Sequence, residues 1–406
     1  MNSPLRECIP AAQGNARWAT MAECKRVLVV VHTLVYTQRL RDTFALLGSD
    51  LRIQVVFTVA PHAFNEGVTG YLSALGGAVL PWEVATTVEF DLVLAAGSQG
   101  IDQLRGPVVR LPHGAGHQKL SPVGEDGQRS ISGLGREFLT WEGELTCTSY
   151  ALAHQDDLTE LSASCPDALR VAEVVGDVDH DRLAASIPYR SEYRQALGLR
   201  DNERFVLVCS TWGTGSVFGQ PDNLLPRLAT ELPPNRFRTA MLVHPNVWAG
   251  HGGWQVRSWV AGTTRGAVTL IAPEADWRPL LAAADFVIGD HGSLTLYATM
   301  TTAPIVLARF PFREVNLRSP GAVLARTAPS LSLTHPLDRQ LDYAERQYRR
   351  EEYALIAARI SSEPGRFSCN MRRLLYRVLE LGEPAHEPEG GRVALPYPLS
   401  GVSQWQ

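Results

Sequence analysis

The stretch ADFVIGDHGSLTLYATMTT, residues 284–302, decides the fold that this sequence predicts. It indicates a short apolar strand over 285–288, a turn, and a helix from Ser293 to about residue 302. Serine is a preferred helix N-cap, and the free N–H groups at a helix start bind anions. Gly292 would let a phosphate approach the backbone, and the Ser293 hydroxyl would add a donor. The stretch is therefore either a phosphate site or an ordinary strand–turn–helix corner with a capping serine.

The composition is that of a soluble globular protein of about two domains. The 406 residues are 45% hydrophobic and 20% charged, with a net charge of −4. This charge gives no support to nucleic-acid or anionic-membrane partners, which need a basic face, but it is compatible with a small nucleotide in a local pocket. The six cysteines contain no C-x-x-C, so neither a disulfide framework nor a zinc site is indicated. Since we find neither a secretory signal nor an apolar run of about 18 residues, we expect a cytoplasmic protein.

Strand and helix patterns alternate in two series along the chain. Apolar runs predict strands at 26–32, 53–59, 78–80, 92–95, 108–111, 145–148 and 171–175, with helices at 38–47, 66–75 and 150–161. After a polar helix at 191–199, strands are predicted at 205–209, 239–243, 268–271, 285–288 and 304–308, with helices at 223–231 and 277–283. Strands separated by helices favour right-handed βαβ units and parallel sheets. The expected fold class is α/β, with two Rossmann-like parallel-sheet domains facing a cleft.

Five segments follow from this pattern. A long polar helix is predicted at 338–360 and a last one at 372–381, and the remainder is rich in proline and glycine. We expect a disordered segment at 1–24, an N-terminal domain at 25–187, a C-terminal domain at 188–335, helices packing across both domains at 336–382, and an irregular tail at 383–406.

A glycine-rich loop, RLPHGAGHQKL at 110–120, follows one of the predicted strands. His113 should lie at the carboxyl edge of the sheet, where a histidine can act as general base towards a hydroxyl. Lys119 can hold a phosphate as a point charge. The spacing of His113 and His117 would suit zinc on a helix, but two intervening glycines and the lack of a third ligand argue against a metal. Alternatively, the histidines of this loop only bond to the backbone.

Two strand ends in the second half carry further candidates. His244 precedes Pro245, which biases it towards an extended conformation, so its ring can face the same cleft or be satisfied locally. Ser210 and Thr211 begin the loop STWGTGSVFG, whose glycines only partly fit the dinucleotide fingerprint. This loop is either part of a diphosphate pocket or a tight turn without a ligand. The charged segment 176–183 indicates a helix start or a hinge between domains, with Asp179 as N-cap.

Taken in order, five elements between about residues 105 and 310 resemble motifs of the CDP-glycerol glycerophosphotransferase family, the teichoic-acid polymerase-like enzymes. Residues 113–119 are similar to H-G-T-x-x-K with one extra residue, and 176–183 to G-x-P-R-x-D-x-L without its proline and arginine. The other three matches are Ser210-Thr211-Trp212 to P-T-W, His244-Pro245 to H-P, and 289–293 to S/T-D-Y-S-S, where the aspartate and final serine are kept.

The resemblance implies a GT-B architecture, with the acceptor on the N-terminal domain and a nucleotide donor on the C-terminal one. It implies that His113 serves as the base and that His244 contacts the donor phosphates, so both are the expected catalytic residues. No metal and no cofactor are expected beyond a nucleotide-diphosphate donor that is CDP-linked. The residues expected to bind the donor and its phosphates are Lys119, Ser210, Thr211, Asp290, His291, Gly292, Ser293 and Thr295.

The predicted function is that of a transferase that moves a polyol-phosphate group, similar to glycerophosphate, from a CDP-activated donor to an acceptor hydroxyl. The acceptor can be a polymer, a lipid-linked molecule or a small molecule, with no nucleic acid and at most peripheral membrane contact. Two alternatives remain open. One is a GT-B glycosyltransferase or nucleotide-sugar 2-epimerase that uses a UDP-sugar. The other is an inactive nucleotide-binding scaffold, since His291 and Gly292 replace the tyrosine and serine of the family motif.

Overall fold

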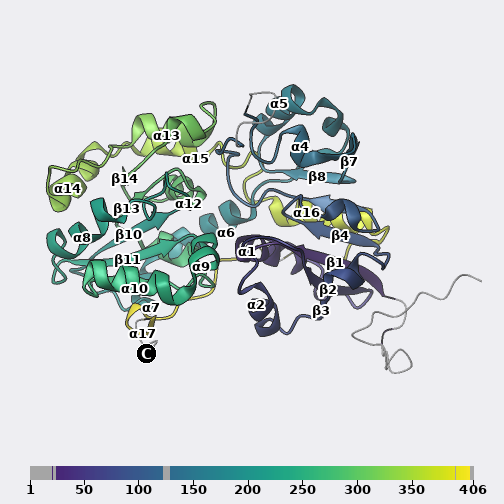
Figure 1. Cartoon of the computed structure of the whole chain (residues 1–406), viewed down its shortest axis with the longest axis horizontal. Helices are drawn as coiled ribbons and strands as arrows, with labels where there is room; N and C mark the ends of the chain where they lie inside the picture. Colours follow the sequence, from purple (N-terminus) through teal and green to yellow (C-terminus); the bar gives the residue numbers. More distant parts are fainter. Residues whose placement is uncertain (1–20, 22–23, 122–128, 389, 403–406) are drawn as a thin grey trace, which may run out of the picture.

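A computed structural model of the chain describes residues 21, 24–121, 129–388 and 390–402. Two domains lie side by side, each built on a parallel β-sheet with helices on its faces (Figure 1). The expected α/β class with two parallel-sheet domains is therefore confirmed. The disorder expected for 1–24 concerns residues that, apart from Met21 and Cys24, lie outside the described part of the chain.

The N-terminal sheet has seven parallel strands in the order β3-β2-β1-β4-β5-β8-β9. They are β1 Lys25–Val31, β2 Ile53–Val59, β3 Val79–Leu80, β4 Leu92–Ala95, β5 Val108–Arg110, β8 Ser149–Leu152 and β9 Ala172–Val174. The helices are α1 Leu34–Phe44, α2 Val68–Ala74, α3 Trp82–Ala85, α4 Arg136–Leu139, α5 Gln155–Ser164 and α6 Val178–Ser186. Two further short strands, β6 Thr140–Trp141 and β7 Glu144–Leu145, pair with each other in an antiparallel hairpin. Strand β1 shows why the sheet is covered on both faces: Leu28 and Val30 join one core, and Val27, Val29 and Val31 join the other.

The C-terminal sheet has five parallel strands in the order β12-β11-β10-β13-β14. They are β10 Arg204–Ser210, β11 Phe237–Val243, β12 Val268–Leu270, β13 Phe286–Gly289 and β14 Ile305–Leu307. The helices are α7 Arg190–Ala196, α8 Pro221–Glu231, α9 Pro245–His251, α10 Gly253–Thr264, α11 Arg278–Ala283, α12 Ser293–Tyr297, α13 Pro320–Thr327, α14 Leu337–Gln347 and α15 Arg350–Ala357. The strand order reverses between β1 and β4 and between β10 and β13. Ligands bind at the carboxyl ends of strands beside such reversals.

The last part of the chain crosses between the domains. Helices α14 and α15 pack on the C-terminal domain, whereas α16, Phe367–Val378, buries Phe367, Met371 and Leu374 in the N-terminal core (Figure 1). The chain then returns to the C-terminal domain, where Leu399 of α17, Leu399–Val402, is buried. The expected division into domains remains our proposal, with α16 as a sequence-distant part of the first unit.

Several local predictions are wrong. The strand expected at 145–148 is β8 instead, and the next helix begins only at Gln155, because His154 and Asp157 form a capping box there. The helix expected at 338–360 is two helices, because Tyr348 adopts an extended ψ of 127° between α14 and α15. The N-cap of α6 is Asp177 rather than Asp179, since the Asp177 side chain accepts a hydrogen bond from the His180 N–H.

A buried network of charges joins the two domains. Helix α6 lies between them, against α1 on one side and α11 on the other (Figure 1). The guanidinium of Arg39, on α1, donates to Asp177 and Asp179, with shortest distances of 2.7 Å to each carboxylate. Tyr297 of the C-terminal domain donates its hydroxyl to the same Asp177 carboxylate, at 2.9 Å. The network also includes Arg41, Asp42, Arg182, Asp276 and Arg278, whose ion pairs link α1, α6 and α11.

Replacing Arg39 tests this network. Arg39→Met would leave the fully buried Asp177 carboxylate without its guanidinium, so we expect a loss of about 3 to 5 kcal/mol in the free energy of unfolding. A matched control is Arg136→Met, because Arg136 also forms a 2.7 Å pair, with Asp167, but both partners are exposed. That variant should lose no more than about 1 kcal/mol. Urea denaturation followed by tryptophan fluorescence measures both losses, and equal losses would contradict the role given to Arg39.

Candidate active site

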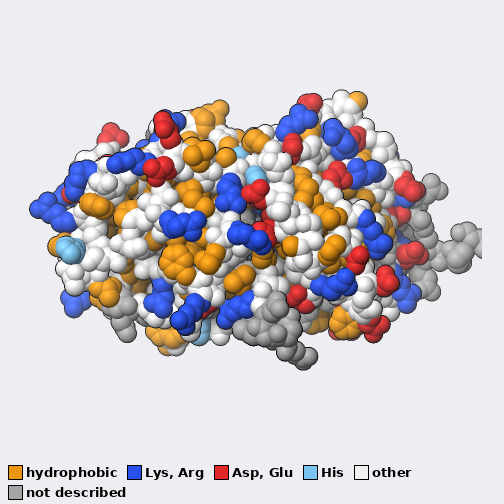
Figure 2. All heavy atoms as spheres, turned by 90° about the horizontal axis from the view of Figure 1, so that it is seen from above, with side chains coloured by type: hydrophobic (Ala, Val, Ile, Leu, Met, Phe, Trp, Pro, Cys, Tyr) orange, Lys and Arg blue, Asp and Glu red, His pale blue; other side chains and the backbone are white. Residues whose placement is uncertain are grey.

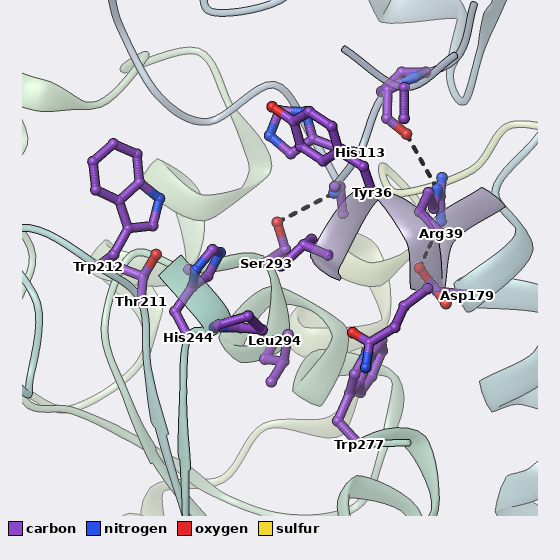
Figure 3. Close-up of a pocket in the computed structure, with 18 of the residues that line it drawn as sticks. Tyr36, Arg39, His113, Asp179, Thr211, Trp212, His244, Trp277, Ser293 and Leu294 are labelled. Carbon is purple, nitrogen blue, oxygen red and sulfur yellow. Dashed lines mark hydrogen bonds and ion pairs between the residues drawn. The ribbon is translucent and has the colours of Figure 1, made fainter. Parts of the chain in front are cut away.

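A cavity of about 340 Å³ lies between the two domains. Its walls are formed by the segments that follow β4 and β5 in the first domain and β10, β11 and β13 in the second. Figure 3 shows residues of both domains around it, with His113 and Tyr36 on one side and Thr211, Trp212 and His244 on the other. The structure thus brings both expected catalytic histidines to one cavity.

His113 follows β5, as the sequence predicts, and is exposed to the cavity. Its ring packs against the ring of Tyr36, with the centroids 4.5 Å apart (Figure 3). Desolvation between the domains lowers the pKa of His113, and the positive charges of Lys119, Arg110 and Arg39 lower it further. The imidazole is therefore neutral near pH 7, and no described residue takes either of its nitrogens in a hydrogen bond.

His244 differs from His113 because one of its nitrogens is already used. It is the N-cap of α9, and its Nδ1 accepts a hydrogen bond from the Asn246 N–H at 3.1 Å. Burial lowers the pKa of His244 well below its usual value, so the ring is neutral. A neutral imidazole that accepts at Nδ1 carries its proton on Nε2. We therefore assign His244 as a hydrogen-bond donor to any ligand in the cavity.

Asp290 organises the floor of the C-terminal half. Its buried carboxylate accepts hydrogen bonds from the N–H groups of Thr211, Val217 and Gly292, at 3.0, 2.9 and 3.0 Å. Burial raises the pKa of Asp290 to about 6, against the effect of these three donors. The carboxylate holds the loop after β10 against the turn after β13, so its contacts shape the site instead of facing it.

The loop after β10 supplies the nearby polar groups. The Ser210 hydroxyl accepts from the Phe218 N–H at 2.9 Å and donates to the Thr211 carbonyl. Lys119 reaches across from the first domain, donates to the Thr211 hydroxyl at 3.1 Å, and lies over the Trp212 ring, 4.8 Å from its centroid. Burial lowers the pKa of Lys119 to about 8, so most of this side chain is still charged at pH 7. Thr211 and Lys119 thus meet at the cavity from different domains.

The glycine-rich part of this loop, 213–219, lies outside the cavity wall. Ser216 donates to the Gly213 carbonyl and accepts from the Gly219 N–H, which closes the loop on itself. Of the two interpretations that the sequence left open, the structure gives the tight turn for 213–219, while Ser210, Thr211 and Trp212 line the cavity.

Ser293 was expected to cap its helix, and this expectation is wrong. The N-cap is Gly292, and Ser293 is the first residue of α12, which ends at Tyr297 and continues as a 3₁₀ turn over Ala298–Met300. The Ser293 hydroxyl instead accepts a hydrogen bond from the Ala115 N–H of the other domain, at 3.3 Å (Figure 3). A Cβ at Gly114 would lie 2.6 Å from this hydroxyl, so a side chain at this position would displace the Ser293 hydroxyl.

The remaining expected residues lie in the same turn. His291 and Thr295 are buried in the cavity wall, and neither the His291 Nδ1 nor the Thr295 hydroxyl has a partner among the described residues. A side chain at Gly292 would press on Thr211 and Asp290, with its Cβ 3.1 and 3.2 Å from their atoms. The structure therefore brings all ten expected residues to one region. Among these ten, Asp290 and Ser210 are the residues whose side chains are most fully hydrogen-bonded within the protein.

The carboxylates of the cavity wall are already engaged. Asp179 bonds to Arg39 and Arg278, Asp276 pairs with Arg278, and Asp290 binds three N–H groups. Among the described residues, no group of three or more histidine, cysteine or acidic side chains could hold a metal ion.

Several cavity residues were missed by the sequence analysis. Two of them, Tyr36 and Arg39, lie on α1, and the other two, Trp277 and Arg278, lie at the start of α11. In the sequence, nothing distinguishes these positions from ordinary helix positions. The only usable signal was the position of α1, which starts directly after β1 at the reversal of strand order. Trp277 stacks on Tyr297 with centroids 5.1 Å apart, and nothing in the sequence indicates this contact.

Neither the charge distribution on the surface nor the character of the described helices indicates a particular partner. On the face that Figure 2 shows, acidic and basic side chains are interspersed among apolar ones, without a continuous patch of one sign. Within the described ranges, we find no helix with both the length and the apolar character needed to cross a bilayer.

The fold and the cavity define a GT-B-type protein with a histidine-lined site between its domains. No family model matches the chain, and no curated protein matches its sequence. Solved structures share the fold. A variant of the wall teichoic acid polymerase TagF has a TM-score of 0.58 at 11% identity, over 88% of this chain and 89% of the other. UDP-GlcNAc 2-epimerase from Neisseria meningitidis, bound to UDP-GlcNAc, has a TM-score of 0.50 at 18% identity, over 87% and 99%. At such identities, the likeness shows the fold.

The neutral state of His291 predicts a dependence of stability on pH. Burial lowers its pKa from 6.5 to about 3, so the unfolded chain takes up a proton below pH 6.5 that the folded chain does not. His291 therefore does not lower the free energy of unfolding above pH 6.5, but it lowers it progressively as the pH falls from 6.5 towards 3. Between pH 7 and 5, the free energy of unfolding should therefore decrease less in His291→Asn than in the wild type. The difference should be at most about 2 kcal/mol. Urea denaturation at both pH values measures it. The same change at the exposed His335 is the control, and equal slopes in the two variants would contradict the expectation.

Proposed function

We propose that the protein is a transferase that moves a polyol-phosphate group, such as glycerophosphate, from a CDP-activated donor to an acceptor hydroxyl. The observation that carries the proposal is the pair of neutral histidines at one interdomain cavity, with different hydrogen-bonding capacities. His244 is committed as a donor through Nε2, whereas neither nitrogen of His113 has a hydrogen-bond partner among the described residues. A group transfer needs both a partner for phosphate oxygens and a base for the incoming hydroxyl.

The chemical step is a direct displacement. The acceptor oxygen attacks the β-phosphorus of the donor and forms the new P–O bond, while His113 takes the hydroxyl proton. The bond from this phosphorus to the bridging oxygen breaks, and the nucleoside monophosphate leaves with the electron pair. His244 and Lys119, together with the first N–H groups of α12, stabilise the charge that develops on the phosphate oxygens.

The comparisons support a nucleotide-activated donor, but they do not distinguish a CDP-linked donor from a UDP-linked one. Structures with this fold include TagF soaked with CDPG, and the epimerase bound to UDP-GlcNAc, so both donor chemistries occur on the fold. We favour phosphoryl transfer because the sequence motifs that resemble the glycerophosphotransferase family lie at the cavity. The absence of a disengaged carboxylate among the described wall residues also leaves histidine as the base.

Donor binding is tested by a thermal-shift screen with CDP-glycerol, CMP, UDP-GlcNAc and UDP. We expect CDP-glycerol to stabilise the protein and His244→Asn to weaken this binding about tenfold or more, because asparagine can still cap α9 but lacks the Nε2–H. His335→Asn serves as the control for a distant histidine. Stabilisation by uridine nucleotides alone would overturn the proposal. In that case, solvent deuterium in the product would indicate an epimerase, and its absence a glycosyltransferase.

The role of His113 is tested by kinetics. His113→Asn should lower kcat by about 10² to 10⁴-fold and leave the KM for the donor nearly unchanged, because the base acts on the acceptor. In the wild type, the lowered pKa of His113 keeps the base deprotonated, so the acidic limb of kcat/KM should lie below pH 6.5. Unchanged kcat in the variant would exclude His113 as the base. Donor binding without turnover of any acceptor would favour the inactive scaffold.

A further inference from the structure

The ring of Tyr36 packs on the imidazole of His113. Their centroids are 4.5 Å apart and their planes are inclined by 36°, so the rings lie roughly face to face (Figure 3). No described residue takes either nitrogen of His113 in a hydrogen bond. A histidine base can be oriented by a carboxylate that accepts from its second nitrogen. Because the carboxylates of this cavity wall are bound elsewhere, the orientation of His113 has to come from packing.

Tyr36 is itself held from several sides. It lies in the first turn of α1, where its N–H donates to the hydroxyl of the N-cap Thr33 at 3.4 Å. Its ring meets the ring of His32 edge to face, with centroids 5.7 Å apart. The Nε2 of His32 lies 2.7 Å from the Gln99 carbonyl oxygen, which fixes that ring in turn. A Cβ at Gly97 would lie 2.9 Å from the Tyr36 ring, so the segment after β4 also closes on it.

A simpler explanation is that Tyr36 only fills space at the start of a helix. Such a role accounts for its contacts with His32 and Gly97, which lie within its own domain. It does not account for the other side of the ring. Tyr36 is half-buried, lines the interdomain cavity, and meets there a histidine that is exposed to the same cavity.

The contact also affects the charge that His113 gains in the proposed reaction. When the imidazole takes a proton, it becomes a cation in a wall where burial and the neighbouring cations already lower its pKa. The face of an aromatic ring carries partial negative charge and attracts a cation that lies over it. The Tyr36 ring therefore favours the imidazolium where the surrounding charges oppose it.

We propose that Tyr36 is a positioning residue for the transfer reaction. Its ring holds the His113 imidazole towards the cavity and stabilises the imidazolium that forms when a ring nitrogen takes the proton of the acceptor hydroxyl. The electron pair of the broken O–H bond stays on the oxygen, which forms the new P–O bond. The inference rests on the proposed function for the role of His113 as the base. Tyr36 itself needs no contact with either substrate.

Kinetics test the effect on the reaction. Tyr36→Leu removes the ring, so we expect kcat to fall about tenfold while the KM for the donor stays nearly unchanged. Tyr36→Phe keeps the ring and should retain most of the wild-type kcat. In a double variant with His113→Asn, Tyr36→Leu should cause no further loss, because the ring then has no base to act on.

Phe44→Leu is the matched control for both measurements. Phe44 also lies on α1, is half-buried, and packs against another aromatic ring, that of Phe57, with centroids 5.1 Å apart. It is not part of the cavity wall. This variant should therefore lose a comparable aromatic contact and keep the wild-type kcat.

A second measurement needs no substrate. In NMR spectra of the full chain with ¹³C-labelled histidine, the His113 signals are identified by their loss in His113→Asn. The ring current of the stacked aromatic ring should displace these signals to lower chemical shift in the wild type and in Tyr36→Phe. The displacement should disappear in Tyr36→Leu and remain in Phe44→Leu. If Tyr36→Leu does not fold, Tyr36→Met replaces it in both measurements, since its flexible side chain fills irregular gaps.

The outcomes separate the proposal from its alternatives. Unchanged His113 signals in Tyr36→Leu would overturn it, and so would an equal loss of kcat when Tyr36→Leu is made in the wild type and in His113→Asn. An unchanged kcat, with a thermal midpoint lowered as in Phe44→Leu, would leave Tyr36 a structural role only. If the wild type turns over no donor and acceptor, the proposed function fails, whereas displaced His113 signals would still support the orientation of His113 by Tyr36.

Discussion

The placement of the two domains depends on a buried network of four arginines and four aspartates. Burial acts to raise the pKa of Asp177, but the charge and hydrogen bonds of Arg39 outweigh it, so the carboxylate stays ionised. The pairing of opposite charges allows the network to be buried, and it requires each partner to stay in position, since a displaced partner leaves an uncompensated charge. Because α1 and α6 supply one part and Asp276 and Arg278 the other, the network favours one angle between the domains.

This arrangement of the domains allows the site to be shared between them. The loop after β5 forms an antiparallel bridge with the second domain, in which Leu120 donates to the Glu314 carbonyl and the Asn316 N–H donates to the Gln118 carbonyl. Lys119, between them, is thereby directed to Thr211, and the neighbouring Gly114 permits the contact with Ser293. His113 and His244, from different sheets, then line one cavity. In the proposed reaction, such positioning of the reacting groups would supply a large part of the rate enhancement.

The sequence predicted what depends on local patterns. Continuous apolar runs identified the strands of both sheets, and the rule that ligands lie at strand carboxyl ends placed His113 and His244 together. The sequence analysis was wrong where contacts between residues far apart in the chain determine the structure. Ser293 is not a cap because it bonds to Ala115, 178 positions away, and Arg39 meets Asp177 across 138 positions. Arg110 lies at the end of an apolar strand, and only the fold shows that its guanidinium is buried without an ion pair to any described acid.

The charges left at the cavity determine what it can bind. Asp179 and Asp276 are neutralised within the network, and Asp290 is held by backbone N–H groups, whereas Lys119 bonds to a neutral hydroxyl and Arg110 to a carbonyl. The same two cations contribute to the lowered pKa of His113. A negatively charged ligand beside these cations would counter them, and nearby negative charge raises the pKa of an imidazole. Under the proposed function, His113 would thus become a stronger base when an anionic substrate is bound, so that substrate binding would prepare the proton transfer.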